Sequence, residues 1–419
     1  MSEGLTATPS GLSRIADGAA VAARWVAVAI GFTVPVSTAL DNYLLVTLLV
    51  CWLASGRWRD KYAAIRANPV ALAALALFAL LMLGLAWGQG PLDDGLLYLR
   101  KYNKLLLLPI LVTVFTDPAD RRRGLLALAV AIALTALLSL ALAAGVLPAG
   151  GLITGMPEDP TVFKKHITQN IFVAFGFLLF AQLGREAASR NLRLLWAVLA
   201  GAAAFDALLL VRGRSGYLVL AALVALLLHD RWRWKGLAAA VVVVLVAFAA
   251  AYQFSNGFRS RVSLAETEAR EWRPDVATET SVGIRLEFYR NTLSIIQRHP
   301  VLGVGTSGFA RAYADQVQGT AMLPTYNPHN QFLLVTAQLG VVGLAFLSAL
   351  FALQWRCAAR LPERTLRTLA RGLVLTFVIA SLFSTPLIDH AESVFFAWLS
   401  GLLFAALPPQ GPIPTPKPA

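Results

Sequence analysis

Residues 281–309 read S-V-G-I-R-L-E-F-Y-R-N-T-L-S-I-I-Q-R-H-P-V-L-G-V-G-T-S-G-F, and residues 327–343 read N-P-H-N-Q-F-L-L-V-T-A-Q-L-G-V-V-G. The first of these segments is polar and carries several arginines, whereas nearly all the rest of the chain consists of apolar runs. The second segment places His329 at the start of one such run. The whole stretch therefore marks the place where an apolar chain presents chemically useful side chains.

The first part of this stretch has helical periodicity. Side chains at i, i+4 and i+7 share one face of a helix. Arg285, Tyr289 and Thr292 fall on one face, and the apolar positions on the other side are Ile284, Phe288, Ile295 and Ile296. This pattern predicts an amphipathic helix that lies at a membrane interface.

The glycine-rich run G-V-G-T-S-G at 303–308 predicts a tight turn that leads the chain back toward the membrane. Glycine suits such a turn because it adopts positive φ without steric cost. The run is not a Walker loop, since it lacks Gly-Lys-Ser/Thr and a preceding strand. A loop that cradles a phosphate is the alternative reading.

The composition predicts the fold class. The chain has 419 residues, of which 57% are hydrophobic and 14% are charged, whereas soluble proteins carry about 25% charged residues. Many apolar runs are about 17–25 residues long, which is the length needed to cross a bilayer core. The sequence predicts an all-α integral membrane protein with about twelve transmembrane helices: 19–38, 41–56, 70–87, 95–115, 123–147, 168–184, 192–211, 215–229, 235–253, 329–355, 368–387 and 391–407.

These spans divide the chain into four regions. Residues 1–253 hold the first nine spans, and 254–328 form one large outer loop with an amphipathic helix. Residues 329–407 hold the last three spans. The tail, 408–419, is rich in proline and is expected to be disordered.

The basic residues predict an orientation. Clusters follow every even-numbered span up to the tenth, beginning at Arg57, Arg121, Arg185, Arg231 and Arg356. Because short basic loops stay in the cytoplasm, both termini are expected to be cytoplasmic. Topology also accounts for the net charge of +13, so nucleic acid is not expected as a partner.

A second set of basic residues lies on the opposite, outer side and breaks this rule: Arg100, Lys101, Lys104, Lys164, Lys165, Arg212, Arg214, Arg285 and Arg290. Clustered cations near the headgroup level suit a phosphate or diphosphate ligand. Ordinary lipid headgroups or ion pairs with nearby acids are the alternatives for each one. The short R-G-R-S-G hairpin at 212–216 would hold two arginines in an ordered position.

His329 is the candidate general base. Asn327 is a good N-cap and Pro328 suits the first helical position, so His329 is expected in the first turn of a helix. The positive end of the helix would keep its imidazole neutral. A histidine that merely bonds backbone is the alternative, and His166 is a rival base.

Arg285, on the polar face of the interfacial helix, can hold a phosphate with two parallel hydrogen bonds. An ion pair with Glu287, Glu279 or Asp275 is the alternative. Asn330 and Tyr289 complete the set of candidate binding residues.

Metal and disulfide chemistry are not expected. Cys51 and Cys357 do not have a metal-ligand spacing. Asp389, His390 and Glu392 are spaced poorly for a metal site, and the chain has no Asp-x-Asp motif. We therefore expect no metal and no other cofactor.

These motifs together resemble the superfamily of bacterial membrane glycosyltransferases that contains O-antigen ligases and O-antigen polymerases. The resemblance rests on R-L-E-F-Y-R-N at 285–291, H-P-V-L-G-V-G-T-S-G-F at 299–309 and N-P-H-N at 327–330. The R-G-R-S-G hairpin and the basic start of the span at 95–115 also fit. Within the superfamily the chain is most similar to the ligases.

The resemblance implies an enzyme that transfers a polysaccharide from undecaprenyl diphosphate to a hydroxyl of lipid A–core, at the periplasmic face of the bacterial inner membrane, without metal and with inversion. His329 and Arg285 would be catalytic. The diphosphate would be bound by Arg212, Arg214, Arg100, Lys101, Lys104, His166, Asn330 and Tyr289. The donor, the acceptor and membrane lipids are the expected partners.

Other functions stay open at this point. An O-antigen polymerase has similar motifs, as does a protein O-oligosaccharyltransferase, although the latter usually carries further C-terminal periplasmic sequence. A flippase for lipid-linked oligosaccharide would need charges along a path through the membrane, and Asp206 is the main charge at such a depth. A non-catalytic protein that binds lipid diphosphate would leave His329 without a role.

Overall fold

The computed structural model describes residues 11–408 except 149, 152, 275 and 277, and it describes no side chain at 11, 12 or 214. The described residues form helices joined by turns, with two isolated β-bridges between 150 and 159 and no strand. The predicted all-α membrane fold is confirmed. From residue 409 onward, the tail predicted to be disordered lies outside the described residues.

The first half of the chain folds into these elements: α1 (Gly11–Val36), α2 (Thr38–Ala54), α3 (Trp58–Ala67), α4 (Pro69–Leu83), α5 (Leu92–Tyr102), η1 (Asn103–Leu106), α6 (Leu107–Val114), α7 (Pro118–Ala143) and α8 (His166–Glu186). Side-chain caps mark several helix starts. Ser37, Asn68 and Asp117 each accept a backbone N–H of the helix that follows, which satisfies donors that the first turn leaves unpaired.

The second half contains α9 (Arg190–Phe205), η2 (Asp206–Leu210), α10 (Arg214–Phe254), α11 (Asn256–Glu271), α12 (Ser281–Arg298), α13 (Phe309–Val317), α14 (Gln331–Ala358), α15 (Arg364–Phe383) and α16 (His390–Phe404). The amphipathic helix predicted from its periodicity is α12. Ile295 is fully buried on its apolar side, but Thr292 on the predicted polar face is also fully buried.

Two long helices are broken inside. α10 turns back at Arg233, whose backbone is non-helical, so that residues 217–224 and 243–248 line one hollow. These two limbs correspond to the separately predicted spans at 215–229 and 235–253. α14 breaks at Gly340, which has φ 63°; this break divides the span predicted at 329–355.

Seven helices in the described part are long and apolar enough to cross a membrane, or up to eight if the bent pair α2 and α3 forms one span. All twelve predicted apolar runs are helical for most of their length, but fewer of them form a separate helix that is long and apolar enough to cross a membrane. The reason is local: α4 and α16 are short, the run at 95–115 is divided among α5, η1 and α6, and both limbs of α10 count as one helix.

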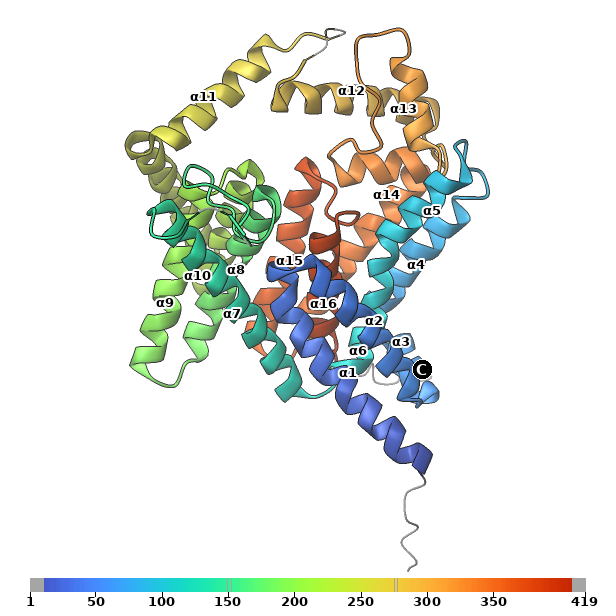
Figure 1. Ribbon diagram of the computed structural model, residues 1–419, viewed down its shortest axis with the longest axis vertical. Coiled ribbons are helices and arrows are strands. Elements are labelled where there is room, and N and C mark those ends of the chain that lie inside the picture. The colour runs from blue at the N-terminus through green and yellow to red at the C-terminus, as the bar shows by residue number, and fades with distance from the viewer. Residues whose placement is uncertain (1–10, 149, 152, 275, 277, 409–419) are drawn as a thin grey trace, which may run out of the picture.

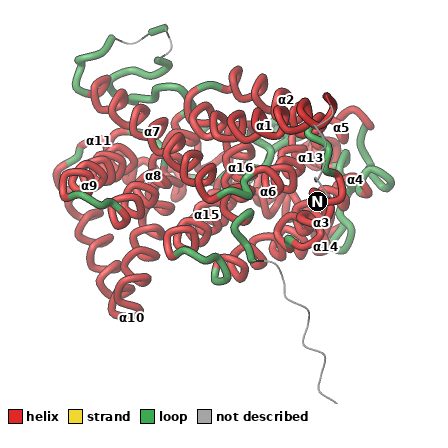
Figure 2. The backbone as a smooth tube through the Cα atoms, turned by 90° about the horizontal axis from the view of Figure 1, so that it is seen from below, coloured by secondary structure: helices red, strands yellow, loops and turns green. Residues whose placement is uncertain are grey.

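Helices α11, α12 and α13 lie together at one end of the molecule, above the bundle that contains α14, α15 and α16 (Figure 1). The start of α1 and helix α3 lie at the opposite end (Figure 1). Helices α9 and α10 form one edge of the bundle, as the perpendicular view shows (Figure 2). The 254–328 region therefore caps one end of the bundle. The first half of this region forms α11.

The glycine-rich run at 303–308 forms the predicted tight turn. Gly303 and Gly305 both have positive φ, and the turn is wedged between the end of α4 and the first part of α14. The N–H of Val304 donates to Ala337 O at 2.9 Å, and the N–H of Thr306 donates to Gly84 O at 2.9 Å. Because backbone carbonyls already occupy these amides, the turn is not a phosphate cradle.

Gly305→Ala should lower the free energy of unfolding by about 2–4 kcal/mol. Its φ is +80°, and an added Cβ would lie 2.3 Å from Gly88 Cα, where only backbone could move. The thermal midpoint of the detergent-purified protein measures the effect. Gly201→Ala in α9 is the control, because a Cβ there meets nothing within 4 Å; equal midpoints for both variants would contradict the packing described.

Candidate active site

Helix α12 presents two side chains, Phe288 and Tyr289, to the segment that carries His329. Thr280 caps the helix by accepting the Gly283 N–H at 3.1 Å. One turn later the Phe288 ring stacks on the His329 ring, with 6.0 Å between centroids. The Tyr289 hydroxyl donates to Leu382 O at 2.7 Å and lies 3.3 Å from His329 O. α12 is thus fixed against both His329 and the end of α15.

The local structure around His329 differs from the prediction. The N-cap of α14 is Asn330, whose side chain accepts the Leu333 N–H at 3.0 Å, so that His329 precedes the helix. Asn327 instead forms a turn in which its Oδ1 accepts the His329 N–H at 2.8 Å. Both asparagines can cap a helix, and sequence alone did not distinguish them. His329 adopts φ 53°, which is uncommon for a residue other than glycine.

The protonation of His329 has a different cause from the one predicted. Burial lowers the pKa of the His329 imidazole, and the nearby positive charge of Arg285 lowers it further. Both effects disfavour the charged ring. They therefore favour the neutral imidazole, the form that can accept a proton.

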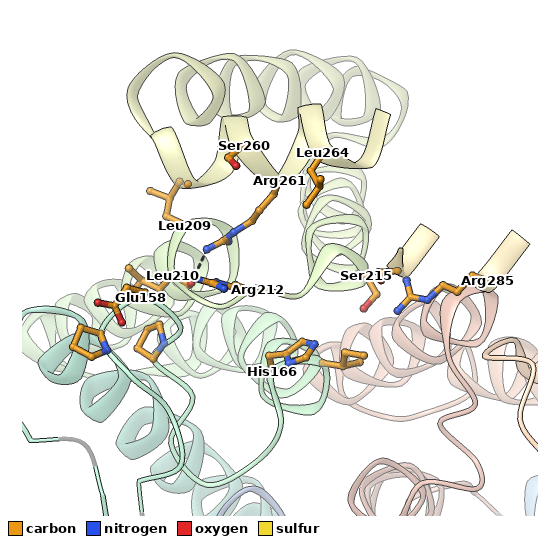
Figure 3. Close-up of a pocket in the computed structure, with 15 residues that line it drawn as sticks. Glu158, His166, Leu209, Leu210, Arg212, Ser215, Ser260, Arg261, Leu264 and Arg285 are labelled. Carbon is orange, nitrogen blue, oxygen red and sulfur yellow. Dashed lines mark hydrogen bonds between the residues drawn. The ribbon is translucent and has the colours of Figure 1, made fainter. Parts of the chain in front are cut away.

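A cavity of about 620 Å³ lies beside this arrangement, under α11. It brings together three predicted residues, His166, Arg212 and Arg285, from the start of α8, the loop before α10 and α12 (Figure 3). His329 does not line the cavity, although its pKa responds to Arg285. Basic and imidazole side chains from distant parts of the sequence thus line one cavity.

Arg261 of α11 is a fourth basic residue in this cavity, and the sequence analysis did not single it out. Its guanidinium donates to Leu210 O at 3.1 Å (Figure 3) and to the Tyr217 hydroxyl at 2.9 Å. It thereby satisfies a carbonyl at the end of η2. The only signal in the sequence was one arginine among the mixed charges of 259–280, where nothing indicated an inward direction.

The hairpin that carries Arg212 is held by Asn170 of α8. The Asn170 side chain donates to Gly213 O at 2.9 Å, and a Cβ at Gly216 would lie 2.1 Å from Asn170 Oδ1. Close packing of this kind supports the ordered hairpin predicted from R-G-R-S-G. Arg214 begins α10, but its side chain lies outside the described residues.

The predicted cluster Arg100, Lys101 and Lys104 does not line the cavity. Lys101 lies over the Tyr326 ring, 4.4 Å from its centroid, and so is near the segment that leads to His329. Burial raises the pKa of Asp389, an effect that Lys101 and Lys165 oppose. This cluster therefore belongs to a separate region between α5 and the loop before α16.

Asp206 is fully buried at the start of η2. Its Oδ1 accepts a hydrogen bond from the Ser139 hydroxyl at 2.6 Å. In the described part of the chain, no group of three or more His, Cys, Asp or Glu side chains is placed to hold a metal ion. The titratable side chains that line the cavity are Glu158, His166, Arg212, Arg261 and Arg285.

An all-helical membrane protein with a cationic cavity at one end is the class that this geometry defines. Residues 199–348 match the family model described as O-antigen ligase, which confirms the resemblance seen in the sequence motifs. The matched segment contains Arg212, Arg261, Arg285 and His329, whereas His166 and the Arg100 cluster lie outside it.

No curated protein matches the chain. Among solved structures, the chain is similar to one from a study entitled "Structural coordination of polymerization and crosslinking by a peptidoglycan synthase complex". The identity is 20%, the TM-score is 0.46, and the match covers 81% of this chain and 96% of that one.

Proposed function

We propose that this protein is an O-antigen ligase, which transfers a polysaccharide from undecaprenyl diphosphate to a hydroxyl of lipid A–core at the periplasmic face of the bacterial inner membrane. The observation that carries the proposal is the cavity that Arg212, Arg261 and Arg285 line, together with His329, whose pKa is lowered by burial and by Arg285. The family match over 199–348 supports glycosyl transfer as the chemistry.

The proposed reaction is a single displacement. The acceptor hydroxyl attacks the anomeric carbon of the donor, the bond from that carbon to the diphosphate oxygen breaks, and the anomeric configuration inverts. His329 takes the proton of the hydroxyl. Arg285 stabilises the negative charge that develops on the departing diphosphate. Arg212 and Arg261 bind the diphosphate in the ground state and the transition state alike. Metal independence is part of the proposal.

Other predicted residues take supporting roles in this proposal. Asn330 and Tyr289 hold the His329 segment against α15, since the Asn330 amide donates to Leu382 O at 3.1 Å and the Tyr289 hydroxyl to the same carbonyl. We place Arg100, Lys101 and Lys104 on the side of the site from which the acceptor approaches, because Lys101 contacts Tyr326.

Arg212→Ala should raise the KM for the lipid-linked donor about tenfold and change kcat little. Arg212 is exposed at the rim of the cavity, so it is expected to contribute to binding of the diphosphate in both ground and transition states. Initial rates at varied donor concentration test this. Arg190→Ala, at the first residue of α9, is the control. A fall in kcat with unchanged KM in Arg212→Ala would contradict the assigned role.

Product analysis distinguishes the ligase from its relatives. Purified protein is given undecaprenyl-diphosphate-linked glycan with and without lipid A–core, and the products are separated by size and by lipid. A ligase forms glycan attached to lipid A–core. Lengthening of the donor glycan without acceptor would identify a polymerase. If neither product formed, the proposal would be wrong.

A flippase is less well supported by this arrangement. Such a protein needs charges along a path across the membrane, but Asp206 is buried and bonded to Ser139. A non-catalytic protein that only binds the donor is tested separately with His329→Ala. In such a protein, loss of His329 would leave donor binding unchanged and no transfer would be seen with either protein.

A further inference from the structure

His329 has a backbone conformation that its surroundings have to hold in place. Its φ of 53° lies in the left-handed region, which residues other than glycine seldom adopt. Such a conformation costs free energy and persists only where neighbouring contacts fix it. The contacts around the His329 backbone therefore determine where its imidazole points.

One of these contacts leads to a residue far along the chain. The Oδ1 atom of Asn327 accepts the His329 N–H at 2.8 Å and the Thr385 hydroxyl at 3.0 Å. A backbone N–H can only donate, so the Asn327 atom that meets it is the side-chain oxygen, and the hydroxyl is then a donor to the same oxygen. Thr385 thereby holds the Asn327 side chain in the orientation that fixes His329.

Thr385 belongs to the loop between α15 and α16, residues 384–389, and this loop also binds the first residue of α14. Ser384 O accepts the Gln331 N–H at 3.0 Å, and the Leu387 N–H donates to Gln331 Oε1 at 3.1 Å. Thr385 and Gln331 are both fully buried. Hydrogen bonds are stronger in the low dielectric of the interior than in water, so this loop is a firm support for residues 327–331.

We propose that Thr385 is a positioning residue for His329: its hydroxyl orients Asn327, which in turn holds the His329 ring in its stack on Phe288. This inference rests on the proposed function, in which His329 is the base. Thr385 does not line the cationic cavity, and it lies outside the family match at 199–348. It acts on the reaction through Asn327 alone.

Removal of the Thr385 hydroxyl should slow transfer without weakening donor binding. Thr385→Val keeps the shape of the side chain and removes the donor. We expect kcat to fall by about tenfold to 10²-fold, as for a catalytic group that is slightly misplaced, and KM for the donor to stay near the wild-type value. Thr385→Ser keeps the hydroxyl and should restore most of the rate.

Thr376→Val in α15 is the matched control. Thr376 is fully buried, and within the described part of the chain its hydroxyl has no hydrogen-bond partner. This variant should therefore transfer at the wild-type rate. A wild-type kcat in Thr385→Val, or equal losses in the two variants, would overturn the proposal.

A double variant shows whether Thr385 acts through Asn327. Asn327→Ala removes the shared acceptor and should lower kcat at least as much as Thr385→Val does. In the Asn327→Ala background, Thr385→Val should cause little further loss, because the contact is already absent. Losses that multiply would overturn the proposal. If Thr385→Val does not insert into the membrane, Thr385→Ala takes its place in the same cycle.

The position of His329 can be followed without turnover. The protein is labelled with ¹³C-histidine, and the His329 ring signals are those that His329→Ala lacks. Thr385→Val should shift these signals, because the ring moves relative to Phe288, whereas Thr385→Ser and Thr376→Val should not. Unshifted signals in Thr385→Val would overturn the proposal even if the rate fell. Shifted signals in a protein whose wild type transfers no glycan would instead contradict only the proposed function.

Discussion

Arg285→Ala is expected to lower the rate of glycan transfer about 10²–10³-fold, the loss typical of removing one preorganised donor from a site of developing charge. Arg285 lines the cationic cavity and also influences His329, so it is placed to act at the bond that breaks. Arg285→Lys should recover only part of the rate, because an ammonium group lacks the planar fork that binds two phosphate oxygens. Transfer rates at saturating donor measure both effects.

Arg298→Ala is the matched control for this prediction. Arg298 lies at the last turn of the same helix, and its guanidinium donates to Gln316 Oε1 at 2.6 Å. Loss of this contact should leave transfer near the wild-type rate. If Arg285→Ala and Arg298→Ala retained equal activity while inserting normally, Arg285 would have no role in the reaction.

His329→Ala should also lower transfer, by about 10²–10⁴-fold, which is the usual contribution of a positioned general base. The histidine is half-buried, stacked on Phe288 and held by the turn from Asn327. His299→Ala, at the end of α12, is the control for loss of a histidine from the same region. If His329→Ala were fully active, His166 would be the next candidate, since it lines the cavity.

The pH dependence provides a further test of His329. Its pKa is lowered from 6.5 by burial and by Arg285, so the neutral base persists to a lower pH than for an ordinary histidine. Transfer should therefore be level around pH 7 and fall only as the pH drops below 6.5. In Arg285→Ala the acid limb of the residual activity should move to higher pH, because the positive neighbour is gone. A limb that stays in place would show that the two residues are not coupled.

Much of the fold follows from local sequence patterns, because apolar runs and helical periodicity depend on near neighbours. The amphipathic α12 and the turn around Gly305 were predicted in this way. The break in α14 at Gly340 was not, since it depends on a distant contact in which the Val341 N–H donates to Pro300 O at 2.8 Å. Glycine within an apolar run gives no sign of such a contact.

Part of the candidate site could also be predicted from the sequence. Arg212, Arg285 and His166 were singled out because basic and imidazole groups on the outer side of an apolar chain need an explanation, and the structure brings them to one cavity. Arg261 was missed because its position depends on carbonyls left unpaired at the end of η2. The Arg100 cluster was predicted on the same side of the membrane as the cavity residues. Lying on one side does not determine which basic residues line the same cavity.

Transfer by the purified protein in the presence of EDTA tests the central claim most directly. Wild type, His329→Ala and Arg285→Ala are compared with undecaprenyl-diphosphate-linked glycan and lipid A–core, and the glycan attached to lipid A–core is measured over time. The proposed mechanism predicts steady transfer by wild type and a loss of at least about 10²-fold in each variant. Abolition of wild-type transfer by EDTA, or equal transfer by all three proteins, would contradict it.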